Sequence, residues 1–98
     1  MNPLESSANL TANITTNGIT TIPGKFVIVR IIVNKKGASS NTAQIYDSAN
    51  TAENLKGTID TTITVGAIEC GYPVFNGIYI VTETGTAPDL TLVYAPMP

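Results

Sequence analysis

The chain has 98 residues, of which 43% are hydrophobic but only 12% are charged, and its formal net charge is −2 at pH 7. The length predicts one domain, and five lysine and arginine residues are too few for the clustered basic surface that nucleic acid requires. The charged fraction is about half the roughly 25% of an average domain. Such a surface fits burial in an assembly, although the threonine that fills its polar positions is equally a good strand residue.

The first residues lack the basic start and apolar run of a secretion signal. No stretch reaches the roughly 18 apolar residues of a membrane helix. A single cysteine, Cys70, excludes a disulfide within the chain and a cysteine-based zinc cluster, and we expect it to be a small buried hydrophobe. We therefore expect a protein made in a reducing cytoplasm, with no membrane partner.

The chain is expected to divide into an N-terminal arm over 1–10, a single β-domain over 11–95 and a C-terminal tail over 96–98. Two runs of isoleucine and threonine flank Asn17 and Gly18, which are the preferred pair for a two-residue hairpin turn. These runs are expected to form either a hairpin or a loop between strands of different sheets.

The segment 25–34 is the longest apolar strand. Strict alternation places Val27, Val29, Ile31 and Val33 on one face, and Phe26, Ile28, Arg30 and Ile32 on the other. The first set suits the core. The second set is also apolar, around a guanidinium, and we expect it to form an interface with another subunit because a small two-layer protein covers only one face of a sheet itself. Arg30 would then form an ion pair between subunits, or its side chain would reach the sheet edge.

Further strands are predicted at 42–47, 55–65, 68–75, 78–83 and 89–95, with an alternative break of the second at 60–62. Pro73 indicates that the third of these is an edge strand or a bulged segment, and the short turn before Asp89 predicts that the last two form a hairpin. No segment has a sustained helical period, apart from a single turn that is conceivable at 51–54. Six to eight short strands predict an all-β, antiparallel β-sandwich, either immunoglobulin-like or a jelly roll.

No residues form a recognisable catalytic constellation. There is no histidine to serve as a base, no nucleophile elbow and no glycine-rich phosphate loop. Asp47 and Glu53 flank one loop, where a weak calcium site is the alternative to solvated carboxylates. We predict no catalytic residue, no cofactor and no metal. The four tyrosines, Tyr46, Tyr72, Tyr79 and Tyr94, are expected to pack at the edge of the core.

Several pieces of the sequence occur in a familiar order. Pro23-Gly24-Lys25 precedes the apolar strand, Ile45-Tyr46-Asp47 ends the next strand, and Gly57-Thr58-Ile59-Asp60-Thr61 follows. The chain then closes with Phe75-Asn76-Gly77 and the strand after it, and with Ala87-Pro88-Asp89 and the strand to Tyr94. Over residues 23–95 this order resembles small β-sandwich structural proteins encoded among the virion genes of tailed bacteriophages.

The resemblance implies a non-enzymatic virion component that is assembled in the host cytoplasm. Proteins of this kind commonly act as capsid cement or decoration proteins, often trimeric, which clamp neighbouring copies of the major capsid protein. The expected partners are therefore other copies of the chain and a virion protein. A component of the neck, tail or head fibre is the alternative within the same class, and a carbohydrate- or receptor-binding module is the alternative from another class.

Overall fold

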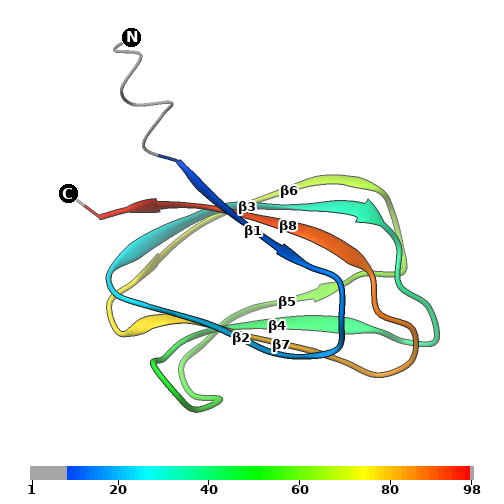
Figure 1. Cartoon of the computed structure of the whole chain (residues 1–98), viewed down its shortest axis with the longest axis horizontal. Helices are drawn as coiled ribbons and strands as arrows, with labels where there is room; N and C mark the ends of the chain where they lie inside the picture. The colour runs from blue at the N-terminus through cyan, green and yellow to red at the C-terminus, as the bar shows by residue number, and fades with distance from the viewer. Residues whose placement is uncertain (1–8, 98) are drawn as a thin grey trace, which may run out of the picture.

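The computed structural model describes residues 9–97, which form eight strands (Figure 1). Their bounds are β1 (Leu10–Ile14), β2 (Gly18–Pro23), β3 (Phe26–Lys35), β4 (Thr42–Asp47), β5 (Leu55–Asp60), β6 (Gly66–Val74), β7 (Gly77–Glu83) and β8 (Asp89–Pro96). The described residues contain no helix, and hence no helix able to cross a membrane. The predicted all-β class is confirmed. The predicted arm lies outside the described residues except for Asn9 and Leu10, and Leu10 already belongs to β1.

The strands form two antiparallel sheets, which we name after their central strands. The β3 sheet has the order β1-β8-β3-β6, and the β4 sheet has the order β2-β7-β4-β5. The pairings β1–β8, β2–β7, β3–β6 and β4–β5 are nested within one another, as if a single long hairpin had been folded over. The further pairings β3–β8 and β4–β7 complete the two sheets. This strand order is that of a jelly roll and not of an immunoglobulin fold.

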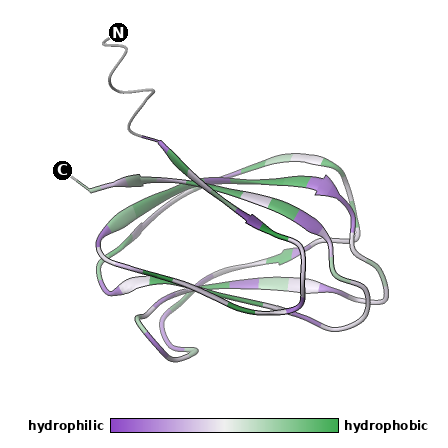
Figure 2. Ribbon diagram, in the orientation of Figure 1, coloured by the Kyte–Doolittle hydropathy of each residue, from purple (hydrophilic) through white to green (hydrophobic). Residues whose placement is uncertain are grey.

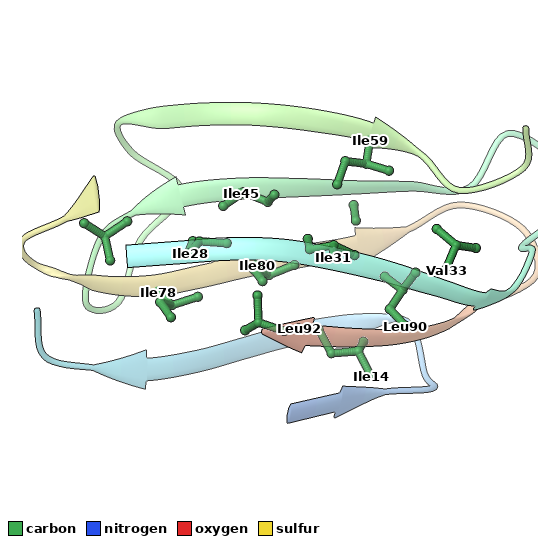
Figure 3. Close-up of a cluster of buried hydrophobic side chains, with 12 residues drawn as sticks. Ile14, Ile28, Ile31, Val33, Ile45, Ile59, Ile78, Ile80, Leu90 and Leu92 are labelled. Carbon is green, nitrogen blue, oxygen red and sulfur yellow. The ribbon is translucent and has the colours of Figure 1, made fainter. Parts of the chain in front are cut away.

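The core fills the space between the two sheets with isoleucine, leucine and valine (Figure 3). Twelve buried residues form it: Ile14, Ile28, Ile31, Val33, Ala43, Ile45, Ile59, Val74, Ile78, Ile80, Leu90 and Leu92. Figure 2 shows hydrophobic segments along the strands of both sheets and hydrophilic segments mainly at strand ends and in loops. Each large side chain that is fully buried here contributes about 1.5–3 kcal/mol relative to exposure.

The predicted alternation of β3 is wrong from Phe26 to Val29, because the strand contains a β-bulge. The register with β8 passes from Ile28 opposite Tyr94 to Arg30 opposite Val93, which leaves Val29 as an extra residue. An extra residue reverses the alternation of the side chains that precede it. Phe26 and Ile28 therefore share the inward face with Ile31 and Val33, and Ile28 is fully buried.

Four expectations about strands and their connections can also be compared with the structure. The segment at Asn17 and Gly18 is not a hairpin, because β1 and β2 belong to different sheets. The last two strands do not form a hairpin either, since β7 pairs in the β4 sheet and β8 in the β3 sheet. The strand predicted over 55–65 ends at Asp60, where its alternative placed the break, but no second strand follows over 61–65. Pro73 does lie in an edge strand, β6.

Candidate functional site

The bulge divides the four residues predicted to form an interface. Arg30 and Ile32 lie on the outward face of the β3 sheet, where they oppose Val93 and Thr91 of β8. Phe26 faces inward, and its ring meets that of Tyr94 edge to face at a centroid distance of 5.1 Å. Ile28 has no exposed surface. The four residues therefore do not form one face, and only Arg30 and Ile32 can contribute to a surface on this sheet.

Arg30 already has a partner within its own chain. Its Nε donates to Glu69 Oε2 across 2.9 Å, between neighbouring strands, and the two side chains are 35% and 68% exposed. An ion pair this exposed contributes at most about 1 kcal/mol. Its effect on the surface is to neutralise the middle of the face. The guanidinium thus needs no charge from another subunit to be paired.

A polar cluster closes one end of the same face. Asp89 Oδ1 accepts hydrogen bonds from the side-chain amides of Asn13, at 2.8 Å, and Asn34, at 3.2 Å. These bonds join β1, β8 and β3, and they lower the pKa of the Asp89 carboxyl from its ordinary value of 3.8. Asn34 also donates to Thr91 Oγ1 at 2.8 Å. The outward face of the β3 sheet therefore combines these paired polar groups with partly or largely buried apolar side chains, among them Ile32 and Val93.

The outward face of the β4 sheet has a different chemistry. Its register places Leu55, Tyr46, Tyr79 and Thr21 in one row across all four strands. The next row contains Thr58, Gln44, Val81 and Ile19. We call the five apolar and aromatic residues of these rows the tyrosine face: Ile19, Tyr46, Leu55, Tyr79 and Val81.

The tyrosine face combines a fixed centre with exposed margins. The rings of Tyr46 and Tyr79 meet at 74° with their centroids 6.0 Å apart. The Tyr46 hydroxyl donates to Gln44 Oε1 at 2.9 Å, and Gln44 Nε2 donates to Glu83 Oε1 at 3.2 Å. At the two edges of the sheet, Leu55 and Ile19 are 56% and 61% exposed. Aromatic rings held in place beside exposed aliphatic groups are typical of the centre of a protein–protein interface.

The alternation of residues 78–81 is a sequence signal for part of the tyrosine face. Alternation along this strand puts Ile78 and Ile80 on the face opposite Tyr79 and Val81, and the two isoleucines are in the core. Tyr79 and Val81 therefore had to face outward. Tyr46 joins them because it pairs with Tyr79 in the neighbouring strand. The expectation that all four tyrosines pack at the core edge fits Tyr72 and Tyr94, which lie against the core cluster.

The loops at one end of the sandwich are joined by a buried asparagine. Asn41 Nδ2 donates to Asn17 Oδ1 at 2.8 Å and to the Thr84 carbonyl at 2.9 Å, while its Oδ1 accepts from the Thr61 hydroxyl at 2.7 Å. Its contacts thus connect three other loops. Thr84 has a φ of 77°, and Gly85 follows where a Cβ would collide with the Ala38 and Ser39 carbonyls. These groups are used to hold the loops, so they are not free to bind a ligand.

A hollow along the β4–β5 loop is a candidate small-ligand site. It has a volume of about 330 Å³ and is lined by polar residues from Asp47 to Asn54 and by Asn76. Asp47 Oδ1, however, accepts from the backbone N–H groups of Phe75 at 3.0 Å and Asn76 at 2.8 Å. Within residues 9–97 no three acidic, cysteine or histidine side chains gather as metal ligands would. Asp47 is therefore better explained as a structural acceptor that anchors the β6–β7 turn.

Cys70 gives no sign of reactivity. Burial raises the pKa of its thiol from the ordinary value of 9.0, which opposes formation of the nucleophilic thiolate.

Comparison with known proteins adds no identification. No protein-family model matches the chain. No curated protein matches it either. The properties of its surfaces are therefore the basis for a functional proposal.

Proposed function

We propose that the chain is a non-enzymatic structural protein of a bacteriophage virion, of the capsid cement or decoration type, which self-associates and clamps neighbouring capsid subunits. The resemblance over residues 23–95 supplies the class of protein, and the jelly-roll sandwich is compatible with it. The observation that carries the proposal is the tyrosine face. It places the exposed aliphatic side chains of Leu55 and Ile19 beside a partly exposed Tyr46, whose ring is held against the buried Tyr79.

The tyrosine face would be the surface that docks on the shell. Leu55 at one margin and Ile19 at the other expose apolar area that a partner can remove from water, at about 25 cal/mol per Å². The hydrogen bonds of Tyr46 and Gln44 restrict these side chains before binding, which reduces the entropy lost on docking. Binding across subunit boundaries would add interfacial free energy to the shell.

The alternatives predict different properties. A neck, tail or head-fibre component would use the same face but would be present in few copies per particle. A carbohydrate-binding module needs an aromatic ring open to stack on a sugar. Tyr79 is only 7% exposed and Tyr46 is partly covered, so the tyrosine face fits a protein partner better than a glycan. Binding in a glycan array would favour the carbohydrate module.

The location can be tested directly on particles of the phage whose genome encodes the chain. Electron microscopy should find the chain on the capsid surface, and quantitative mass spectrometry should give a copy number that matches the capsid lattice. A copy number of one small ring would instead indicate a neck or tail component. Absence from purified particles would contradict the proposal.

The docking surface can be tested with a matched pair of variants. Leu55→Glu places a charge on the tyrosine face, whereas Val65→Glu places one at a site of similar exposure, 58%, in the β5–β6 loop. Particles assembled without the protein, or with Leu55→Glu, should rupture at a lower temperature than wild-type particles. Particles with Val65→Glu should behave as wild type. Equal heat resistance of all four preparations would overturn the role as cement.

A further inference from the structure

We propose that the side of the sandwich formed by the edge strands β1 and β2 is its self-association surface, on which a second copy pairs β2 with β2 in antiparallel fashion about a two-fold axis. This inference deepens the proposed function and rests only on its self-association part. Within residues 9–97 both strands are edges, each paired on one side, so the other side of each carries backbone N–H and C=O groups without a ladder partner among these residues. Such groups can form main-chain hydrogen bonds with another extended strand.

The two sides of the sandwich differ in how their edges are protected. Residues 9–23, which include β1 and β2, contain no charged side chain, and their single proline, Pro23, is the last residue of β2. On the opposite side, β5 carries Lys56 and Asp60, and β6 carries Glu69 and Pro73. Charges and proline on edge strands are the usual means by which proteins prevent edge-to-edge pairing. The β5–β6 side has charges and a proline within its strands, whereas the β1–β2 side has no charge and only the terminal Pro23.

The space between the sheets is also closed on one side and open on the other. On the β5–β6 side, the Tyr72 ring lies against Gly57 of β5 and covers the gap. On the β1–β2 side, Leu10 belongs to the inward row of β1, opposite Tyr94, and is nevertheless 42% exposed. Ile22, opposite the core residue Ile78, is only partly buried. Apolar side chains of the inward rows thus reach the surface on this side, where a partner could bury them.

A second copy fits this side better than a single added strand. β1 and β2 lie in different sheets but face the viewer together in Figure 1, in front of β8 and β7. One peptide strand can complete only one of these edges, whereas another sandwich supplies two edges at the same spacing. The molecule measures 41 × 28 × 17 Å, and Figure 1 looks along the shortest dimension at this broad side. A side of this size accommodates the roughly 800 Å² per partner of a standard interface.

The register of β2 restricts the position of the two-fold axis. Ile19 and Thr21 face outward, and Thr20 and Ile22 face inward. Residues directly opposite in an antiparallel pair must share a face, so a symmetric pairing is centred on a residue and not between two residues. The centre of the strand then places the axis at Thr20 or at Thr21. Either choice keeps the inward row of one copy continuous with that of the other.

The first experiment measures the oligomeric state of purified protein by sedimentation. Wild-type protein should be dimeric. Thr21→Lys should raise the dimer dissociation constant at least about tenfold, because a two-fold axis brings the two introduced charges close together. Thr58→Lys is the matched control, because Thr58 is an exposed threonine on the same outward face of the opposite edge strand, β5. This control should remain dimeric, with circular dichroism confirming that both variants are folded.

The second experiment locates the axis by crosslinking. In a Cys70→Ala background, either Thr20→Cys or Thr21→Cys should form a disulfide dimer on oxidation, and Thr58→Cys should not. A monomeric wild type, a trimer as the resemblance implies, dissociation by Thr58→Lys alone, or absence of crosslinking at both β2 positions would each overturn the inference. A virion protein that is monomeric in solution would contradict self-association but leave the structural role in the virion standing. A dimer that is absent from virions would support this inference and contradict that role.

Discussion

The phenol oxygen of Tyr72 lies where it leaves room for glycine and nothing larger at position 57, because a Cβ there would come within 2.6 Å of it. The contact joins β6 of one sheet to β5 of the other. We expect Gly57→Ala to lower the free energy of unfolding by about 1–3 kcal/mol, the usual cost of overpacking. Urea denaturation measures this loss.

The double variant tests the cause of that loss. Tyr72→Phe removes the hydroxyl, so Gly57→Ala should cost less in the Tyr72→Phe background than in the wild type. Equal costs in the two backgrounds would show that the alanine is destabilising for a reason other than contact with the phenol.

Two buried threonines should respond to valine with opposite signs. The Thr82 hydroxyl is buried on the inward face of β7 and has no hydrogen-bond partner among residues 9–97. Burial of an unpaired hydroxyl costs about 1–3 kcal/mol, so Thr82→Val should stabilise the protein by roughly that amount. Thr61→Val should destabilise it, because the Thr61 hydroxyl donates to Asn41 Oδ1 at 2.7 Å. Thermal unfolding of both variants checks the signs, and a lower melting temperature for Thr82→Val would contradict this assignment.

The pH dependence of stability should include a contribution from Asp89. Its amide partners lower its pKa in the folded state below the ordinary 3.8. A carboxyl with a lowered folded-state pKa stabilises the protein above the unfolded-state value and loses that contribution as the pH falls through the folded-state value. We therefore expect the stability advantage of wild type over Asp89→Asn to be present at neutral pH and to disappear below pH 3.8.

Chemical denaturation at a series of pH values measures this difference. Asp60→Asn is a useful comparison, because hydrogen bonds from Thr62 likewise lower the pKa of Asp60 but do not join separate strands. A constant difference between wild type and Asp89→Asn at all pH values would contradict the role of the Asp89 charge.

Neighbouring isoleucines of β3 provide a test of the bulge. Ile28 is fully buried, so Ile28→Ala should cost about 2–5 kcal/mol by creating a cavity. Ile32 faces outward, so Ile32→Ala should cost distinctly less. Uninterrupted alternation would place both residues on one face with similar costs. Urea denaturation distinguishes the two cases, and equal losses would indicate that β3 has no bulge.

The bulge of β3 could not be predicted from the sequence of that strand, although the strands themselves could. The positions of the strands could be predicted from β-branched residues and turn signals. The edge position of Pro73 could be predicted because proline has no backbone N–H to donate to a neighbouring strand. A bulge at Val29 leaves no mark in β3, where the residues from Phe26 to Val33 are apolar apart from Arg30. The available sign was in the partner strand, where Gly71 interrupts an extended run and has a φ of 68°.

Which strand pairs with which could not be predicted from the local sequence either. Asn17 and Gly18 favour a hairpin locally, yet β1 and β2 are separated because each finds a longer apolar partner at the other end of the chain, β8 and β7. The tyrosine face depends on this arrangement, since it is assembled from four strands that are distant in the sequence. Local patterns determine which way Tyr79 points, but only the tertiary pairing brings Tyr46 beside it.

The nested pairing has a consequence for how the chain reaches its structure. The innermost hairpin, β4–β5, closes a short loop, whereas each pairing outside it closes a longer one, and the outermost joins Leu10 to Tyr94. Closing longer loops costs more chain entropy and slows folding. A newly made chain must therefore be released almost to its end before β1 can find β8. Until then β1 remains unpaired. It belongs to the same uncharged side, formed by β1 and β2, that the folded protein would use to bind a second copy.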